Sequence, residues 1–303
     1  MMYDIIIVGA GPAGLSAAIY GVRSGKSVLV LEKSTYGGQI INTPEVENYP
    51  GIQKISGYEF ATNLYNQAVN LGAEVVYEEV TAIEEQGELK KVVTKDHVYE
   101  CHSVILATGA RNRRLGLDRE EELTGAGVSY CATCDGMFFR GKDVAVAGGG
   151  NTALEDALFL SNYCKTVYLI HRREEFRGEK KILDALREKE NVVFILNANV
   201  IRLNGEDRLS SVTVKDKNTG EEKDIPVSGI FVAIGQEPVN QPFEDLVKMD
   251  DHGYIISGEE CGTSMEGVFT AGDCRTKQVR QLTTAASDGA VAALQACNYI
   301  SGV

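Results

Sequence analysis

The chain has 303 residues, of which 44% are hydrophobic and 24% are charged, and its formal net charge at pH 7 is −13. This length allows two domains of ordinary size, and the composition is that of a folded globular protein. The acidic balance disfavours a general binder of nucleic acid or anionic lipid, because both require a basic protein surface. No apolar run reaches the roughly 18 residues of a membrane span, and the first residues lack the features of a secretory signal. We therefore expect a cytoplasmic protein without membrane spans.

Cysteine usage supports the same compartment. The chain has seven cysteines, an odd number, and only Cys131 and Cys134 form a C-x-x-C pair. This pattern disfavours a secreted disulfide framework and favours a reducing environment. We expect the scattered cysteines to be buried apolar residues, namely Cys101, Cys164, Cys261, Cys274 and Cys297.

The first 32 residues predict a nucleotide-binding unit. Residues 4–8 are fully apolar, as in a buried parallel strand, and residues 15–23 have a helical pattern. Between them stands the run Gly9-Ala10-Gly11-Pro12-Ala13-Gly14. In such a turn the first glycine permits the tight bend, the second lets a pyrophosphate approach the backbone, and the third lets helix and strand pack closely. The helix N-terminus then receives the pyrophosphate.

The residue that closes the second strand, residues 26–31, indicates which adenosine binds. Glu32 lies 23 positions after Gly9 and precedes Lys33. A carboxylate at this place accepts hydrogen bonds from ribose hydroxyls, which predicts an adenosine without a 2′-phosphate. Alternating strands are then expected over residues 75–106, ending in Ala107-Thr108-Gly109.

The same unit returns in the second half of the chain. Residues 143–147 predict a strand, the turn is Gly148-Gly149-Gly150-Asn151-Thr152-Ala153, and residues 154–163 predict a helix. A second strand is expected over residues 166–170. Residues 192–234 repeat the alternating strands and end in Ile234-Gly235. The chain thus contains an internal duplication of a nucleotide-binding domain.

The two copies differ at the residue that selects the nucleotide. His171 lies 23 positions after Gly148 and is followed by Arg172, Arg173 and Arg177. A carboxylate would repel a 2′-phosphate, whereas guanidinium groups bind one bidentately. The second copy is therefore predicted to bind an NADP-type nucleotide, although a solvated basic face would give the same residues.

A cysteine pair stands between the copies, in the run Cys131-Ala132-Thr133-Cys134-Asp135. Two cysteines three apart at a helix start can form a disulfide, and the helix N-terminus would stabilise a thiolate. Half of a zinc site and two inert thiols are the alternatives. No second C-x-x-C and no histidine spacing completes a metal site, so no metal is expected. Asp135 is either a proton donor and acceptor for a thiolate or a plain helix-start carboxylate.

Together these motifs resemble the low-molecular-weight, bacterial-type thioredoxin reductases over essentially the full length. Further matches are Gly37-Gly38-Gln39, residues 46–51 and Ala271-Gly272-Asp273. The resemblance implies an α/β fold of two Rossmann-like dinucleotide-binding domains, the second inserted into the first, and a homodimer. The implied FAD domain comprises residues 1–112 and 240–303, and the NADPH domain comprises residues 113–239.

The resemblance also implies roles for single residues. The catalytic residues are Cys131, Cys134 and Asp135. The cofactor-binding residues are Gly9, Gly11, Pro12, Ala13, Gly14, Glu32, Lys33, Gly38, Gln39, Asn48, Thr108, Gly109, Gly272, Asp273, Arg280, Gln281 and Leu282, with Gly148, Gly150, Asn151, Thr152, His171, Arg172, Arg173, Arg177 and Ile234. Met137 and Phe138 stand where the family places apolar residues that face thioredoxin, and core packing is the alternative.

The implied reaction is the transfer of electrons from NADPH through FAD and the Cys131–Cys134 disulfide to thioredoxin. The family rotates its domains, which makes the links near Ala110–Leu115 and Gln236–Asn240 the expected hinges. A ferredoxin-dependent flavin thioredoxin reductase and a reductase of another small redoxin remain alternatives. A ferredoxin-fed enzyme should lack the NADPH residues, which are present here. A redox-sensing regulator without turnover is the non-enzyme alternative.

Overall fold

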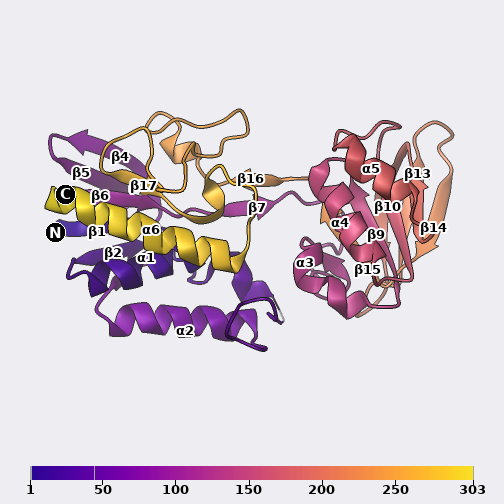
Figure 1. The fold of residues 1–303 in the computed structure, drawn as a ribbon, viewed down its shortest axis with the longest axis horizontal. Coiled ribbons are helices and arrows are strands. Elements are labelled where there is room, and N and C mark those ends of the chain that lie inside the picture. The colour runs from indigo at the N-terminus through magenta and orange to yellow at the C-terminus, as the bar shows by residue number, and fades with distance from the viewer. Residues whose placement is uncertain (1, 44, 303) are drawn as a thin grey trace. The chain divides into compact units, whose positions relative to one another are not determined.

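The computed structural model describes residues 2–43 and 45–302 and divides into two compact units (Figure 1). The first unit comprises Met1–Arg111 and Glu237–Val303, and the second comprises Asn112–Gln236. The second unit is thus inserted in the chain of the first.

The first unit is built on a sheet with the order β3-β2-β1-β6-β5-β4, and β17 pairs with β6 in addition. Its strands are β1 (Met2–Val8), β2 (Val28–Leu31), β3 (Glu74–Val76), β4 (Val80–Gln86), β5 (Leu89–Thr94), β6 (Val98–Leu106) and β17 (Val268–Thr270). Along one edge, residues 98–101 of β6 pair antiparallel with β5, and residues 104–106 pair parallel with β17. The long strand β6 therefore joins the N-terminal part of the unit to its C-terminal part.

Helices cover one face of this sheet (Figure 1). They are α1 (Pro12–Arg23), α2 (Gly57–Asn70) and α6 (Leu282–Ser301), with the short helices η1 (Gly38–Asn42), η3 (Gln241–Phe243) and η4 (Gly272–Cys274) elsewhere in the unit. A Cβ on Gly289 would lie 2.1 Å from the carbonyl oxygen of Ala13, so glycine is what lets α6 pack directly on α1. The opposite face buries Phe243, Val247 and Ile255 against alternate residues of the strands.

The second unit has a parallel sheet with the order β11-β10-β9-β15-β8 and a separate antiparallel sheet β12-β13-β14. The strands are β8 (Val128–Ser129), β9 (Asp143–Gly148), β10 (Thr166–Ile170), β11 (Val192–Ile195), β12 (Ala198–Asn204), β13 (Ser211–Asp216), β14 (Glu222–Pro226) and β15 (Gly229–Ala233). The helices are α3 (Ala132–Asp135), η2 (Gly136–Phe139), α4 (Asn151–Ser161) and α5 (Lys180–Arg187). Side chains of α4 and α5 pack on one face of the parallel sheet, and the antiparallel sheet packs on the other.

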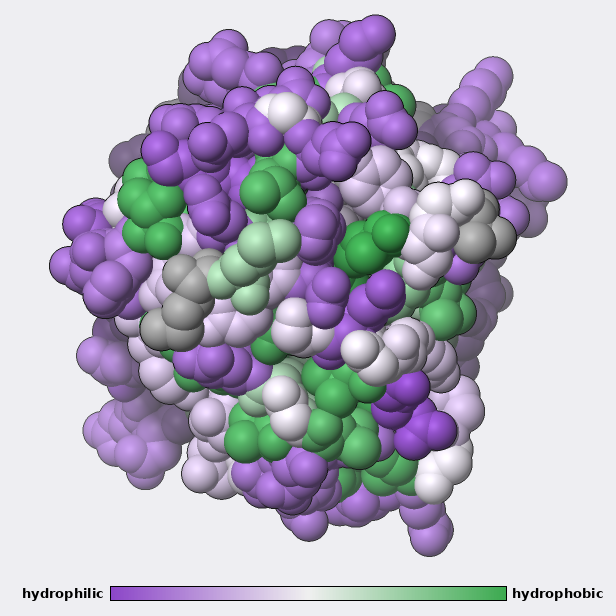
Figure 2. All heavy atoms as spheres, turned by 90° about the vertical axis from the view of Figure 1, so that its left-hand side faces the viewer, coloured by the Kyte–Doolittle hydropathy of each residue, from purple (hydrophilic) through white to green (hydrophobic). Residues whose placement is uncertain are grey.

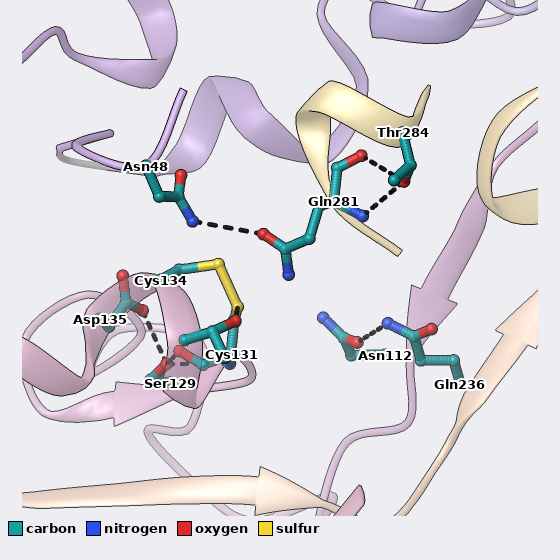
Figure 3. Close-up of a disulfide and its surroundings, with 10 residues drawn as sticks. Asn48, Asn112, Ser129, Cys131, Cys134, Asp135, Gln236, Gln281 and Thr284 are labelled. Carbon is teal, nitrogen blue, oxygen red and sulfur yellow. Dashed lines mark hydrogen bonds between the residues drawn. A yellow bond between two sulfur atoms is a disulfide. The ribbon is translucent and has the colours of Figure 1, made fainter. Parts of the chain in front are cut away.

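The chain passes between the units at β7 (Ala110–Asn112) and β16 (Gln236–Pro238), which pair as a two-stranded sheet. The amide of Gln236 donates to Oδ1 of Asn112 at 2.8 Å, within the second unit (Figure 3). The link is therefore hydrogen-bonded by side chains as well as by backbone.

The predicted elements are confirmed, with small shifts at their ends. The helices expected from Leu15 and Leu154 begin three residues earlier, at Pro12 and Asn151. In α1 the first turn contains proline, whose fixed φ and missing N–H suit a helix start. The helix expected from Gln281 to about Ile300 is α6.

Figure 2 shows the side of the first unit where β1 begins, and hydrophobic residues there form small patches among hydrophilic ones. Across residues 2–43 and 45–302, no helix is both long and apolar enough to span a bilayer.

Candidate functional site

The two cysteines of the C-x-x-C pair form a disulfide, with their Cα atoms 5.3 Å apart. Strand β8 leads into Cys131, which is the N-cap of α3. Helix α3 is a single turn, so its dipole is small and contributes little to the stabilisation of a thiolate. The stabilisation by a helix N-terminus that the sequence suggested is thus weak. The disulfide also argues against the half zinc site, because its sulfurs are bonded to each other.

A hydroxyl connects the backbone of Cys131 to the neighbouring acid (Figure 3). Ser129 Oγ donates to Oδ2 of Asp135 at 2.7 Å and accepts from the backbone N–H of Cys131 at 3.1 Å. The hydroxyl of Thr133 lies 3.4 Å from the sulfur of Cys131. Sequence reasoning missed Ser129, which stands two residues before the motif and carries no signal of its own.

The carboxyl of Asp135 is partly buried. Burial raises its pKa, and the hydrogen bond from Ser129 acts in the opposite direction. A carboxyl group with a raised pKa holds its proton to a higher pH than a surface aspartate, which suits proton exchange with a thiol. This environment favours the proton donor and acceptor over the plain helix-start carboxylate.

Two apolar side chains beside the redox pair are exposed. Met137 is 46% exposed and Phe138 is 40% exposed, and both lie on η2, directly after α3. The alternative that they only fill the core is wrong.

The first glycine turn has room for a ligand. A Cβ on Gly9, whose φ is +108°, would lie 2.4 Å from the carbonyl oxygen of Ala107, and one on Gly14 would lie 1.9 Å from that of Gly9. Gly11 is different, because its φ is −76° and the nearest atom to a Cβ would be 3.9 Å away, in Gly38. The protein's own packing does not require glycine there, whereas a pyrophosphate against the backbone would.

Glu32 and Gly272, which are also predicted to bind FAD, lie beside this turn. Glu32 is buried and accepts from the N–H groups of Ala10 and Ser34 at 2.9 and 3.0 Å. A Cβ on Gly272 would lie 2.8 Å from that of Ala13. The amide of Asn48 donates to the side chain of Gln281 at 3.3 Å (Figure 3).

Asp273 has an oxygen atom that is available to accept a hydrogen bond from a ligand hydroxyl. Its Oδ1 is buried and has no hydrogen-bond partner among the described residues. Burial raises the pKa of Asp273, while the charges of Lys277 and Arg280 oppose the shift. A buried oxygen of this kind fits a hydroxyl donor such as the polyol chain of a flavin.

Further residues of the predicted FAD set make contacts within the protein. Thr108 donates to Oδ1 of the buried Asn240 at 2.7 Å, and Gln39 donates to the carbonyl of Ala110. The guanidinium of Arg280 lies 4.3 Å from the ring centre of Tyr254. Lys33 is exposed.

The second glycine turn repeats the arrangement of the first. A Cβ on Gly148 would lie 2.3 Å from the carbonyl oxygen of Ala233 and 2.7 Å from the Cβ of Ala153. Gly150 has an ordinary φ of −98°, and a Cβ added there would have no atom within 4 Å among the described residues. The space beside Gly150 therefore fits a second nucleotide.

The residues after β10 differ in exposure: His171 is buried, whereas the arginines that follow it are exposed. His171 is buried, stacks on Phe176 with ring centres 4.9 Å apart, and fills the space beside Gly149. Burial lowers the pKa of His171, so its imidazole is neutral at pH 7 and brings no charge to a phosphate. The positive charges of this segment are those of the arginines.

Three exposed guanidinium groups remain for a phosphate. Within the described residues, the side chains of Arg172, Arg173 and Arg177 form no hydrogen bond or ion pair, and the backbone N–H of Arg177 donates to Gly149 at 2.8 Å. Asn151 accepts from the N–H of Glu179 at 2.7 Å, which also ties this segment to the turn. Thr152 and Ile234 are exposed.

Comparison with known proteins identifies the family of the chain. A family model described as pyridine nucleotide-disulphide oxidoreductase matches residues 3–289. A thioredoxin reductase of Treponema pallidum is 45% identical and covers 98% of this chain and 97% of its own length. The bifunctional thioredoxin reductase/thioredoxin of Mycobacterium leprae is 43% identical over 99% of this chain, which spans 66% of that longer protein.

Among solved structures, the thioredoxin reductase of Streptococcus pyogenes superposes with a TM-score of 0.95 at 42% identity, covering 100% of this chain and 99% of that one. The chain therefore belongs to the pyridine nucleotide-disulphide oxidoreductases and, within them, to the thioredoxin reductases, whose members use FAD and NADPH.

Proposed function

We propose that this chain uses NADPH to reduce the disulfide of thioredoxin. The observation that carries the proposal is the Cys131–Cys134 disulfide, with the backbone N–H of Cys131 linked through the hydroxyl of Ser129 to the partly buried Asp135. The same unit holds an open glycine turn and three arginines whose side chains form no hydrogen bond or ion pair with described residues, so it would bind a nucleotide as well as carry the redox pair.

The residues divide between two cofactors. The first unit would hold FAD with the turn at Gly11, the carboxylate of Glu32 and the unpartnered oxygen of Asp273. The second unit would hold NADPH at Gly150, with the 2′-phosphate on the arginines that follow β10. When bound, the two cofactors supply a two-electron path from the nicotinamide to the disulfide.

The chain's own chemistry is thiol–disulfide exchange. Two electrons and two protons convert the Cys131–Cys134 disulfide into two thiols, and Asp135 can hold a proton beside them. One thiolate then attacks the partner's disulfide, so that a mixed disulfide forms and one partner thiolate leaves. The other cysteine attacks the mixed disulfide, which restores the Cys131–Cys134 bond and releases the partner as a dithiol.

Met137 and Phe138 would provide the apolar contact for the partner, because they are exposed immediately after the redox pair. The name of the Mycobacterium leprae relative joins a reductase to a thioredoxin in one chain. This favours thioredoxin over another small redoxin as the partner.

We further infer the setting in which the enzyme works. The five remaining cysteines are free and buried, which suits a reducing compartment such as the cytoplasm. The protein would act as a homodimer, as the resemblance implies, and its mass in solution would show this. The nicotinamide and the redox pair must each exchange electrons with the flavin, and one arrangement of the domains can hardly serve both. The strands β7 and β16 would therefore serve as hinges for a rotation between two arrangements.

Replacing Cys134→Ser should abolish NADPH-dependent reduction of thioredoxin, because no disulfide can re-form. Anaerobic bleaching of the flavin by NADPH should persist, since it precedes the disulfide. Cys164→Ser, at a buried free cysteine of the same unit, is the matched control and should stay active. Survival of thioredoxin reduction in Cys134→Ser would show that the scheme is wrong.

The double variant Arg172→Ala with Arg173→Ala should raise KM for NADPH by roughly tenfold or more, because a hydrogen bond to a charged group contributes about 1.5–3 kcal/mol. The rate with NADH, which lacks the 2′-phosphate, should not change. Arg187→Ala, on the exposed side of α5, is the control. Equal efficiency of NADPH and NADH with the unaltered chain, or flavin reduction by ferredoxin alone, would contradict the nucleotide assignment.

Phe138→Ala should raise KM for thioredoxin about fivefold to tenfold, since truncating one of the few contact side chains that carry the binding energy costs roughly 1 kcal/mol or more. Turnover with a small aromatic disulfide should stay the same, because that substrate needs no docking surface. Val193→Ala, at another exposed apolar residue of the second unit, provides the comparison. An unchanged KM for thioredoxin in Phe138→Ala would exclude this residue from docking.

Ser129→Ala should reduce kcat at neutral pH roughly tenfold, because proton transfer requires a positioned group. The hydroxyl stabilises the carboxylate of Asp135, so its loss raises the pKa of Asp135 further. The limb of the pH–rate profile that reports Asp135 should therefore move to higher pH, and Asp135→Asn should remove it. Ser161→Ala removes another hydroxyl of the unit and should leave the profile in place. An unshifted profile in Ser129→Ala would mean that Ser129 does not tune the acid.

A further inference from the structure

Glu120 is a buried carboxylate that the reaction above does not use. It is 3% exposed, and four donors surround it. Its Oε1 accepts from the N–H of Leu115 and the hydroxyl of Tyr130, both at 2.8 Å. Its Oε2 accepts from the N–H groups of Gly116 and Leu117 at 2.8 and 3.3 Å. These donors replace the water that a buried carboxylate loses.

The partners of Glu120 come from two functionally different segments. Residues 115–117 follow β7, the strand that links the units, whereas Tyr130 directly precedes Cys131. Burial, followed by the bond to Glu120, raises the pKa of Tyr130, so the phenol keeps its proton and remains a donor. The ring of Tyr130 packs on the same core cluster as Leu115 and Leu117. One carboxylate therefore ties the chain after the link to the residue beside the redox pair.

Backbone pairing alone restrains the chain before Cys131 only weakly. Strand β8 has two residues, Val128 and Ser129, and they pair with Ile230 and Phe231 of β15. Side chains supply further restraints on the two residues before Cys131: Ser129 bonds to Asp135, which follows the pair, and Tyr130 bonds to Glu120. In the oxidised protein the disulfide also fixes Cys131, but that restraint is lost when the pair is reduced.

We propose that Glu120 and Tyr130 are positioning residues that hold Cys131 close to Cys134 in the reduced enzyme. The proposal rests on the redox function proposed for the Cys131–Cys134 pair. Holding two thiols together raises the effective concentration of one at the other, which favours closure of the disulfide. The dithiol is then a stronger reductant, and the mixed disulfide with the partner is resolved faster.

The test is Tyr130→Phe, which removes the hydroxyl and keeps the ring. The equilibrium of the Cys131/Cys134 pair with glutathione should shift about tenfold or more toward the dithiol, as expected for loss of one hydrogen bond to a charged group. The kcat for thioredoxin should fall by a similar factor. The KM for thioredoxin and the rate of flavin reduction by NADPH should stay the same, because neither depends on closure of the disulfide.

Two further variants sharpen the result. Tyr3→Phe removes another tyrosine–glutamate bond, from Tyr3 to Glu74 at 2.7 Å in the first unit, and should leave the equilibrium unchanged. Glu120→Gln replaces one acceptor oxygen by a donor that faces N–H groups, and it should shift the equilibrium in the same direction as Tyr130→Phe. The thermal midpoint of each variant reports any general loss of stability.

The outcomes separate this proposal from the one on which it rests. If the unaltered chain fails to reduce thioredoxin with NADPH, the proposed function is wrong, while the glutathione equilibrium still tests the positioning role. If the unaltered chain is active but Tyr130→Phe has the parent equilibrium and kcat, the positioning role is wrong. A lower thermal midpoint with an unchanged equilibrium would also overturn it, since the bond would then be merely structural.

Discussion

Each unit depends on a close approach between a glycine and the end of a neighbouring parallel strand. A side chain on Gly9 would overlap the carbonyl oxygen of Ala107, and one on Gly148 would overlap that of Ala233. These carbonyls stand at the ends of β6 and β15, which are the sheet neighbours of β1 and β9. Because the chain can bend there, the following helix begins over the carboxyl edge of its sheet, where nucleotides bind in this type of fold.

In the proposed scheme the same architecture binds two different ligands, and a few charged residues distinguish the two sites. In the first unit the buried Glu32 and the unpartnered oxygen of Asp273 offer acceptors to hydroxyl groups. In the second unit, exposed arginines offer donors to a phosphate, and the neutral ring of His171 fills the space behind the turn. A resident FAD and a visiting NADPH follow from this contrast in the proposed scheme.

The segment around the redox pair, residues 128–135, is held differently, because polar side chains there do what longer strands and helices do elsewhere. Cys131 lies between the two-residue strand β8 and the one-turn helix α3, which contains Cys134, and such short elements cannot by themselves fix two sulfur atoms that must separate and rejoin. Ser129, Asp135, Tyr130 and Glu120 supply hydrogen bonds on both sides of Cys131. Hydrogen bonds of this kind restrain the segment even when the disulfide is reduced. A pair that cycles between disulfide and dithiol requires such a restraint.

The sequence by itself determined the main strands and helices, both glycine turns and the redox pair, because each is encoded in residues that are close in the chain. It also determined the duplication, because the same pattern of strand, glycine turn and helix occurs twice. Only the tertiary structure decided that His171 is buried, that Met137 and Phe138 are exposed, and that Asp273 has an unpartnered oxygen among the described residues. It alone brought Glu120 to Tyr130 and Ser129 to Asp135. Those contacts depend on the path of irregular loops and on which side chains exclude water, and no periodicity in the sequence records either.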